Sequence, residues 1–203
     1  MNARWINALV FAALYVAFLA WYDGWGQSPL TPTEVEEYLA GMPADTQSDD
    51  FAERMRQMGA DDDGNEIYML NLNRYRYADG ENEDAPPAAY RKYGSSVVPM
   101  ILRNGGHPIY VGTFPSGSIE ASDEATDWDE VLLVRYRSRR DFIRMVTSAA
   151  YIEAARDRSV AIAYAEVTPT TAQMSLAAPR LIVFLLLLVP ALLNDYRLRR
   201  RVS

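Results

Sequence analysis

The chain has 203 residues, of which 49% are hydrophobic and 11% aromatic, enough to build one ordinary folded domain with additional segments. It contains no cysteine, which excludes disulfides, thiolate nucleophiles and cysteine-based zinc or iron-sulfur sites. The net charge is -7, although four arginines gather between residues 197 and 201. This acidic balance disfavours nucleic acid as a partner.

The first predicted element is an apolar helix near the amino terminus. Residues 5–21 read WINALVFAALYVAFLAW, which carries no charge and has tryptophan at both ends. A helix of this range is about 25 Å long, just enough to cross the hydrocarbon core of a bilayer, and its tryptophans suit the two interfaces. A cleaved signal peptide is the alternative, but Phe18 two residues before Ala20 makes a poor cleavage site. The pattern therefore predicts an uncleaved anchor.

The last predicted element is a second apolar helix. Residues 181–193 read LIVFLLLLVPALL, which is short for a membrane span unless the helix extends on both sides and Arg180 stretches its side chain to the interface. A buried core helix is the alternative. Because the leucine run covers every side of the helix and leaves no polar face, the membrane interpretation is favoured.

Charges next to the two helices predict their orientation. Arg4 precedes the first, Arg197 and further arginines follow the second, and the acidic Asp23 and Glu34 follow the first. Because cytoplasmic flanks of spans carry the excess of Lys and Arg, both termini are expected in the cytoplasm. Arg180 is a single contrary charge on the other side. The predicted protein is a two-pass protein of the cell (inner) membrane with its middle part exoplasmic, which in a bacterium is periplasmic, and the lipid bilayer is its first expected partner.

A helical linker is expected after the first anchor, with short helices at residues 33–42 and 48–58. The following run from Asp61 to Glu66 resembles half of a calcium loop. Its spacing departs from that motif, because Glu66 stands where the turn glycine belongs. A solvated acidic turn is therefore favoured, and no metal site is predicted.

The central segment alternates strand-like and helix-like patterns. Strands are expected at 67–77, 108–114, 130–136 and 161–167, and helices at 86–103 and 138–156. The order is βαββαβ, the ferredoxin-like split βαβ arrangement, in which both helices cover one face of an antiparallel sheet. The fold class is thus α+β, a ferredoxin-like domain flanked by two transmembrane helices. The predicted parts are the anchor 1–25, the helical linker 26–65, the domain 66–170, the transmembrane helix 174–197 and the basic cytoplasmic tail 198–203.

Several motifs of this segment resemble a known family. They are YMLNLNRYR at 68–76, HPIYVG directly after the glycines 105 and 106, WDEVLLVRYRSRRDF at 128–142 and MVTSAAYIEAARDRSVA at 145–161. They are similar to a bacterial family of uncharacterised function within the dimeric α+β barrel superfamily, over residues 67–168. The resemblance implies a homodimer in which the sheets of two subunits face each other. The superfamily includes small monooxygenases, muconolactone-type isomerases, haem-binding chlorite dismutase relatives and ligand sensors, so the fold alone selects no reaction.

Polar residues in the predicted strands form the candidate site. Strand alternation predicts one sheet face that carries Asn71, Asn73, Tyr75, Arg135, Tyr164 and Glu166. The favoured interpretation is a structural ion pair between Arg135 and Glu166, joined by an asparagine of the first strand. The alternative is a pocket for a small anionic or hydroxylated ligand, with Arg135 as anion clamp and Asn71 as orienting amide.

His107, the only histidine, is the remaining candidate. An imidazole serves as an axial haem ligand or a general base, but a histidine at a turn is more commonly a surface residue. No phosphate loop, dinucleotide motif, nucleophile elbow or HExxH sequence is present, and no cofactor is predicted.

Three functions remain open at the level of the sequence. The favoured one is a membrane-anchored dimerisation or accessory module, for which another membrane protein is a candidate partner. The second is a cofactor-independent monooxygenase- or isomerase-like enzyme acting on a small lipophilic substrate, and the third is a haem or small-ligand sensor. Whether the domain is an enzyme is not decided by these residues.

Overall fold

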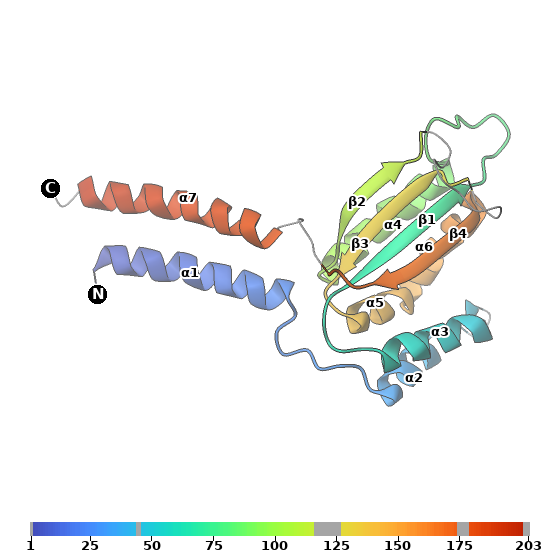
Figure 1. Ribbon diagram of the computed structural model, residues 1–203, viewed down its shortest axis with the longest axis horizontal. Coiled ribbons are helices and arrows are strands. Elements are labelled where there is room, and N and C mark those ends of the chain that lie inside the picture. Colours follow the sequence, from blue (N-terminus) through green and yellow to red (C-terminus); the bar gives the residue numbers. More distant parts are fainter. Residues whose placement is uncertain (1, 44–45, 116–126, 174–178, 201–203) are drawn as a thin grey trace. The chain divides into compact units, whose positions relative to one another are not determined.

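A computed structural model describes residues 2–43, 46–115, 127–173 and 179–200 (Figure 1). The chain forms two compact units. One unit combines Met1–Gly26 with Gln173–Ser203, and the other is Gln27–Ala172. Each unit has its own internal packing and is described by itself.

The first unit is a pair of long apolar helices, α1 (Ala3–Tyr22) and α7 (Pro179–Arg200). Both are long and apolar enough to cross a membrane, and only 6% and 0% of their most apolar windows is buried. The helices run antiparallel, because residues near the start of α1 contact residues near the end of α7. Their apolar side chains therefore face outward instead of forming a core.

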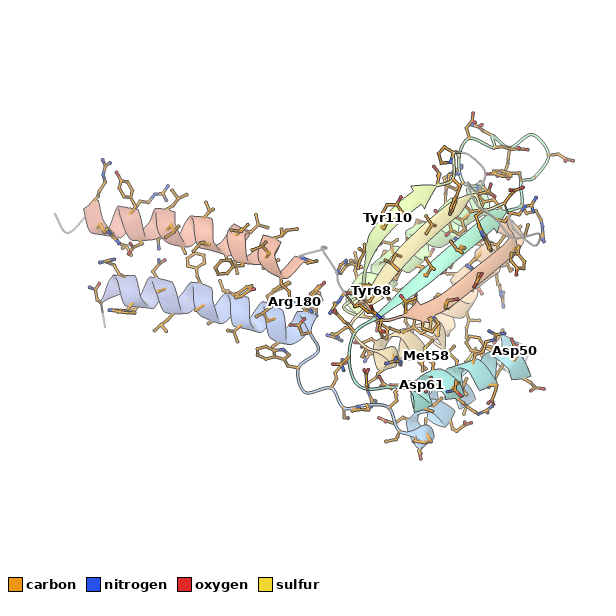
Figure 2. The ribbon with its side chains drawn as sticks, in the orientation of Figure 1. Asp50, Met58, Asp61, Tyr68, Tyr110 and Arg180 are labelled. Atoms are coloured by element: carbon orange, nitrogen blue, oxygen red, sulfur yellow. The ribbon has the colours of Figure 1, made fainter. Side chains whose placement is uncertain are left out.

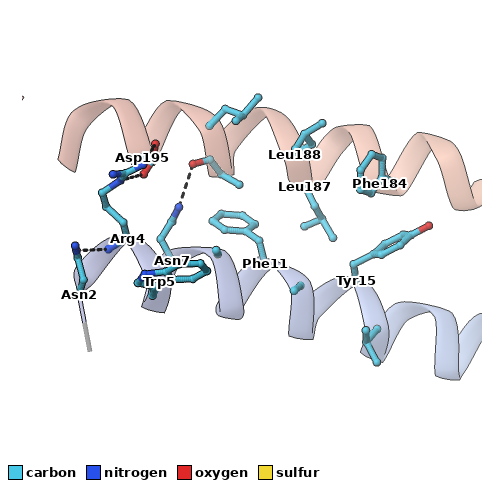
Figure 3. Close-up of a pocket in the computed structure, with 15 residues that line it drawn as sticks. Asn2, Arg4, Trp5, Asn7, Phe11, Tyr15, Phe184, Leu187, Leu188 and Asp195 are labelled. Carbon is cyan, nitrogen blue, oxygen red and sulfur yellow. Dashed lines mark hydrogen bonds and ion pairs between the residues drawn. The ribbon is translucent and has the colours of Figure 1, made fainter. Parts of the chain in front are cut away.

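Polar contacts join the two helices at both ends. Asn7 donates to the Ala191 carbonyl at 3.1 Å and accepts from the Asn194 amide at 2.6 Å. Arg4 pairs with Asp195 at 2.6 Å near one end. A groove of about 570 Å³ runs between the helices beside these contacts (Figure 3).

Arg180 lies at the opposite end of the helix pair and has an acidic partner there. Its guanidinium lies 2.7 Å from the Asp23 carboxylate. The contrary charge noted in the sequence is thus neutralised by the acidic residue that follows α1. Paired polar groups of this kind are the ones that helix pairs tolerate in apolar surroundings.

The second unit contains a four-stranded antiparallel sheet. Its strands are β1 (Ile67–Tyr75), β2 (His107–Thr113), β3 (Glu130–Tyr136) and β4 (Ile162–Thr170), arranged in the order β2-β3-β1-β4. With helices following β1 and β3, this is the predicted ferredoxin-like arrangement. The loop expected between β2 and β3 lies largely outside the described residues.

Three helices cover one face of the sheet (Figure 1): α4 (Ala88–Arg103), α5 (Arg139–Val146) and α6 (Ala149–Ala161). The sequence predicted one helix where α5 and α6 stand. The Ser148 hydroxyl caps α6 by accepting from the Tyr151 amide, and the Thr147 hydroxyl donates to the Ile143 carbonyl. These local bonds end one helix and start the next.

Two further helices, α2 (Pro32–Ala40) and α3 (Asp49–Ala60), form a pair that extends this helical layer. Thr31 and Glu34 form a reciprocal capping box at the start of α2. Arg140 of α5 donates to the Glu34 carboxylate and to the Pro29 carbonyl. The pair is therefore held to α5 by charge as well as by apolar packing.

The acidic turn after α3 is not simply solvated, which corrects the sequence interpretation. The Asp62 carboxylate has no exposed surface and accepts from the Leu30 amide at 2.8 Å. Asp63 accepts from Arg139 at 2.8 Å. The turn is a structural junction, and the described residues contain no group of three or more side chains suited to a metal ion.

Candidate functional site

The register of the sheet separates the predicted site residues onto two faces. Asn71 and Asn73 lie opposite Leu132 and Glu130, whereas Arg135 lies opposite Tyr68, at the alternate positions. Asn71, Asn73 and Tyr75 therefore face the helices, and the other predicted residues lie on the open face. The prediction of a single shared face was wrong, because alternation within each strand does not determine the register between strands.

Arg135 has a structural role on the open face. It is 1% exposed and its Nε donates to Glu66 at 2.7 Å, while Glu66 also accepts from the Tyr68 hydroxyl at 2.9 Å. Glu166 is exposed and lies opposite Leu72, about 13 Å farther along β1 at ~3.3 Å per residue. The expected ion pair between Arg135 and Glu166 is wrong; the partner of Arg135 is Glu66.

Tyr164 and His107 also lie away from the helix-covered face. Tyr164 is 55% exposed and its ring centroid is 5.4 Å from that of Trp128. His107 opens β2 opposite Arg135, and its Nδ1 is 3.1 Å from the Pro108 carbonyl. Neither residue lines the cavity between the sheet and the helices.

A cavity of about 660 Å³ separates the helix-covered face of the sheet from the helices above it. Its walls come from all four strands and from α3, α4, α5 and α6, and its apolar lining includes Met58, Met69, Val97, Ile101, Leu132 and Val134. Pockets that enclose small organic molecules have volumes of roughly 300 to 1,000 Å³ and mostly apolar walls. The cavity is thus of a size for a ligand.

Gly94 contributes to this space. It lies on the inner stripe of α4 with Tyr90, Val97 and Ile101, and it lines the cavity. A Cβ atom added at Gly94 would have no atom within 4 Å. The cavity therefore exists in part because this position of the buried helix face has no side chain.

One end of the cavity is polar. The Glu130 Oε2 atom accepts from the Tyr90 hydroxyl at 2.7 Å and from the Asn73 amide at 2.9 Å. Arg158 donates to the Asn73 Oδ1 atom at 3.2 Å. Glu130, Tyr90 and Asn73 are 7%, 9% and 1% exposed, so this is a buried, hydrogen-bonded cluster in which Asn73 links a carboxylate to a guanidinium. Glu130, Tyr90 and Arg158 also line the cavity.

Tyrosines extend the cluster. Burial, followed by the negative charge of Glu130, raises the pKa of Tyr90 and of Tyr75 well above the usual range, so both hydroxyls remain protonated donors. The Tyr75 hydroxyl is buried, and no hydrogen bond of acceptable geometry joins it to Glu130 or to any other described residue. On the cavity wall, the Tyr93 and Tyr151 hydroxyls are 3.3 Å apart.

Sequence reasoning found Asn73 and Tyr75 but missed Glu130 and Arg158. A signal for Glu130 exists in the strand EVLLVRY, where a carboxylate shares alternate positions with Leu132 and Val134, both of which face the core. Arg158 has no comparable signal. Its proximity to Asn73 depends on the packing of α6 against the sheet.

The fold and this cavity together define an α+β domain with ferredoxin-like topology and a partly open pocket that has a polar end. Among solved structures, the chain is similar to a protein of unknown function from Rhodopseudomonas palustris, with 27% identity and a TM-score of 0.52 over 64% of this chain and 96% of that one. The methylated form of that protein aligns with 29% identity and a TM-score of 0.51 over 63% and 93%.

A third structure, a dimeric protein of unknown function and ferredoxin-like fold from Bacteroides fragilis, aligns with 10% identity and a TM-score of 0.37 over 53% of this chain and 96% of that one. A likeness this low indicates neither a shared fold nor a shared assembly. No protein-family model and no curated protein matches the chain. The residues of the cavity are therefore the main basis for a function.

Proposed function

We propose that this protein is a membrane-anchored α+β domain that binds a small lipophilic molecule between its sheet and its helices. The observation that carries the proposal is the cavity of about 660 Å³ with the buried Glu130 cluster at one end. Apolar walls favour a lipophilic ligand through the hydrophobic effect. The polar end supplies the few fixed groups that orient a ligand in such pockets.

Two features of the site favour binding over simple packing. Burying a carboxylate is costly unless it is hydrogen-bonded, and here Glu130 and its donor Tyr90 both line an open space. Gly94 leaves that space unfilled where a larger apolar residue would complete the core. The proposed site differs from the one expected from sequence, because Asn71 lines it but Arg135 and Glu166 do not.

The membrane anchor is the second part of the proposal. Apolar side chains of both long helices are exposed within their unit, for example Leu9 at 54% and Leu186 at 67%, and lipid is the surrounding that suits them. The proposed topology has two spans, both termini in the cytoplasm and the domain on the exoplasmic side. A lipophilic ligand would then be available from the bilayer itself.

Single-cysteine labelling tests this topology, since the natural chain has no cysteine. We expect a membrane-impermeant maleimide to label Ser159→Cys, on the exposed surface of the domain, in intact cells with a permeabilised outer membrane. Asn2→Cys should react only after lysis. The reverse pattern would overturn the orientation, and recovery of the full-length chain from the soluble fraction would overturn the anchor.

The cavity is tested by filling it. Wild-type protein in lipid nanodiscs is expected to bind 2-methoxynaphthalene more than empty nanodiscs do, measured by fluorescence titration. Gly94→Leu places a side chain in the open space and should raise the dissociation constant at least about 10-fold, equivalent to ~1.4 kcal/mol. Gly94→Ala is the matched control that leaves most of the space. Equal binding by wild type, Gly94→Leu and empty nanodiscs contradicts the proposal.

An enzymatic role on the same site is a second candidate. The Glu130 carboxylate, held by two hydrogen bonds beside the cavity, is a group that an isomerase-like reaction needs in order to accept and return a proton. Turnover of a bound lipophilic carbonyl compound that is lost in Glu130→Gln would support this role. A haem sensor using His107 has no comparable support, because His107 lies outside the cavity lining.

A further inference from the structure

We infer that the polar end of the cavity recognises a hydroxyl group, so that the ligands of this protein are lipophilic alcohols or phenols. This inference rests on the proposed ligand-binding function and specifies its ligand class. It follows from which hydrogen-bonding atoms of the cluster are already used by the protein and which remain.

Two acceptor atoms remain at the cavity. Both donors to Glu130 reach its Oε2 atom, and in the described part of the chain no hydrogen bond reaches Oε1. Asn71 uses its amide nitrogen to donate to the Met69 and Leu132 carbonyls at 3.0 and 3.3 Å, which leaves its Oδ1 atom as an acceptor. Both residues line the cavity, so a ligand that donates a hydrogen bond suits this end.

Tyr75 belongs to the cluster but does not line the cavity. Its ring centroid lies 5.0 Å from that of Tyr90, and the charge of Glu130 acts on its buried hydroxyl. The atoms offered to a ligand are therefore the acceptors of Glu130 and Asn71. A ligand hydroxyl donates a hydrogen bond without adding charge, and it is matched to these acceptors.

The charge of the cluster favours a neutral ligand group. Glu130 carries a negative charge and Arg158 a positive charge, and Asn73 links the two through hydrogen bonds at 2.9 and 3.2 Å. A carboxylate ligand would be repelled by Glu130, and an ammonium ligand would be repelled by Arg158. A hydroxyl adds no charge to a cluster whose two opposite charges already balance.

Two probes of nearly equal size test the inference: 2-naphthol, which has a hydroxyl, and 2-methoxynaphthalene, in which a methyl group replaces the donated hydrogen. Dissociation constants are measured by fluorescence with full-length protein in nanodiscs, relative to empty nanodiscs. We expect wild type to bind 2-naphthol about 10-fold more tightly or better, as for a hydrogen bond to a charged acceptor.

Variants assign the preference to Glu130. Glu130→Leu is expected to bind both probes with equal affinity. Glu130→Gln keeps the shape of the side chain, and the logarithm of its ratio of dissociation constants is expected to be less than half of the wild-type value. Glu166→Gln removes a carboxylate of the open face and should behave as wild type. Circular dichroism melting establishes that each variant is folded, and Glu130→Gln together with the wild-type comparison decides the result where Glu130→Leu does not fold.

The outcomes distinguish ligand binding in the cavity from recognition of a hydroxyl group. If neither probe binds, the proposed function is wrong. If wild type binds both probes with equal affinity, the cavity binds ligands but the hydroxyl inference is wrong. A preference that persists unchanged in Glu130→Gln and Glu130→Leu would also overturn the inference, because another group would then bind the hydroxyl.

Discussion

Gly59 shows how closely two helices of the domain approach each other. It is buried in α3, and a Cβ atom added there would lie 2.4 Å from Cγ2 of Val35 in α2. Val35 is 2% exposed, and its branched side chain has little freedom to rotate away. We expect Gly59→Ala to destabilise the protein by about 1 to 2 kcal/mol in chemical unfolding, after the gain in helix propensity is subtracted.

The matched control for Gly59 is Gly94→Ala, another glycine-to-alanine change within a helix. No atom lies within 4 Å of the added Cβ at Gly94, so this variant should be more stable than wild type by about 0.5 to 1 kcal/mol. If both variants shift stability in the same direction, the close approach of α2 and α3 is not the cause.

Glu34 gives the domain part of its acid sensitivity. The hydrogen bond from Arg140, followed by the bonds from Thr31, lowers the pKa of Glu34 from 4.5 to about 2. A folded-state pKa below the unfolded one means that this stabilisation is present above about pH 4.5 and is lost as the pH falls toward about 2. Glu34→Gln should therefore unfold with a shallower loss of stability in this window.

The control for Glu34 is Glu37→Gln, which removes an exposed carboxyl from the same helix. Stability at each pH is measured by denaturant unfolding from pH 6 down to the acid transition, in steps of about half a unit, since the slope of stability against pH reports proton uptake. A slope for Glu34→Gln that equals the wild-type slope contradicts the role of the Arg140 bond.

At the scale of elements, the sequence predicted the βαββαβ order, but not how the strands align. The sequence located β1 and β3 because each is a short run rich in apolar and aromatic residues. It carried no information on register, so the prediction grouped Asn73 with Arg135 and missed Glu130, the actual neighbour of Asn73. The break between α5 and α6 was missed for a related reason, because Thr147 and Ser148 act through local hydrogen bonds that apolar spacing does not record.

The contact between α1 and α7 can be tested with introduced cysteines, because the chain has no cysteine of its own. The side-chain amides of Asn7 and Asn194 are hydrogen-bonded at 2.6 Å, so a short bis-maleimide should cross-link Asn7→Cys/Asn194→Cys within one chain. Leu9→Cys/Leu186→Cys, whose native residues are 54% and 67% exposed, should not be cross-linked. The product is read as a mobility shift of the monomer on a reducing gel. A dimer band from the first pair would mean that the helices pair between chains.

At the scale of the whole molecule, the expected homodimer concerns the open face of the sheet. Leu70, Leu72, Val131 and Leu133 lie half-buried at its centre, and Tyr110, labelled in Figure 2, is 56% exposed beside them. The helices α4, α5 and α6 cover the other face (Figure 1). We propose that a second copy of the chain covers this apolar face, in a homodimer of the dimeric α+β barrel type.

This dimer can be tested with one charge. Leu133→Glu would bury an unpaired carboxylate between the two sheets at a cost of about 3 kcal/mol or more, which raises the dimer dissociation constant at least ~100-fold. Val160→Glu adds the same charge to an exposed site of α6, 65% accessible, and should remain dimeric. Native mass spectrometry of the full-length protein in mild detergent gives the mass of each assembly. A wild-type monomer would refute the homodimer, whereas a dimer that survives Leu133→Glu would move the contact from the sheet to the apolar helices.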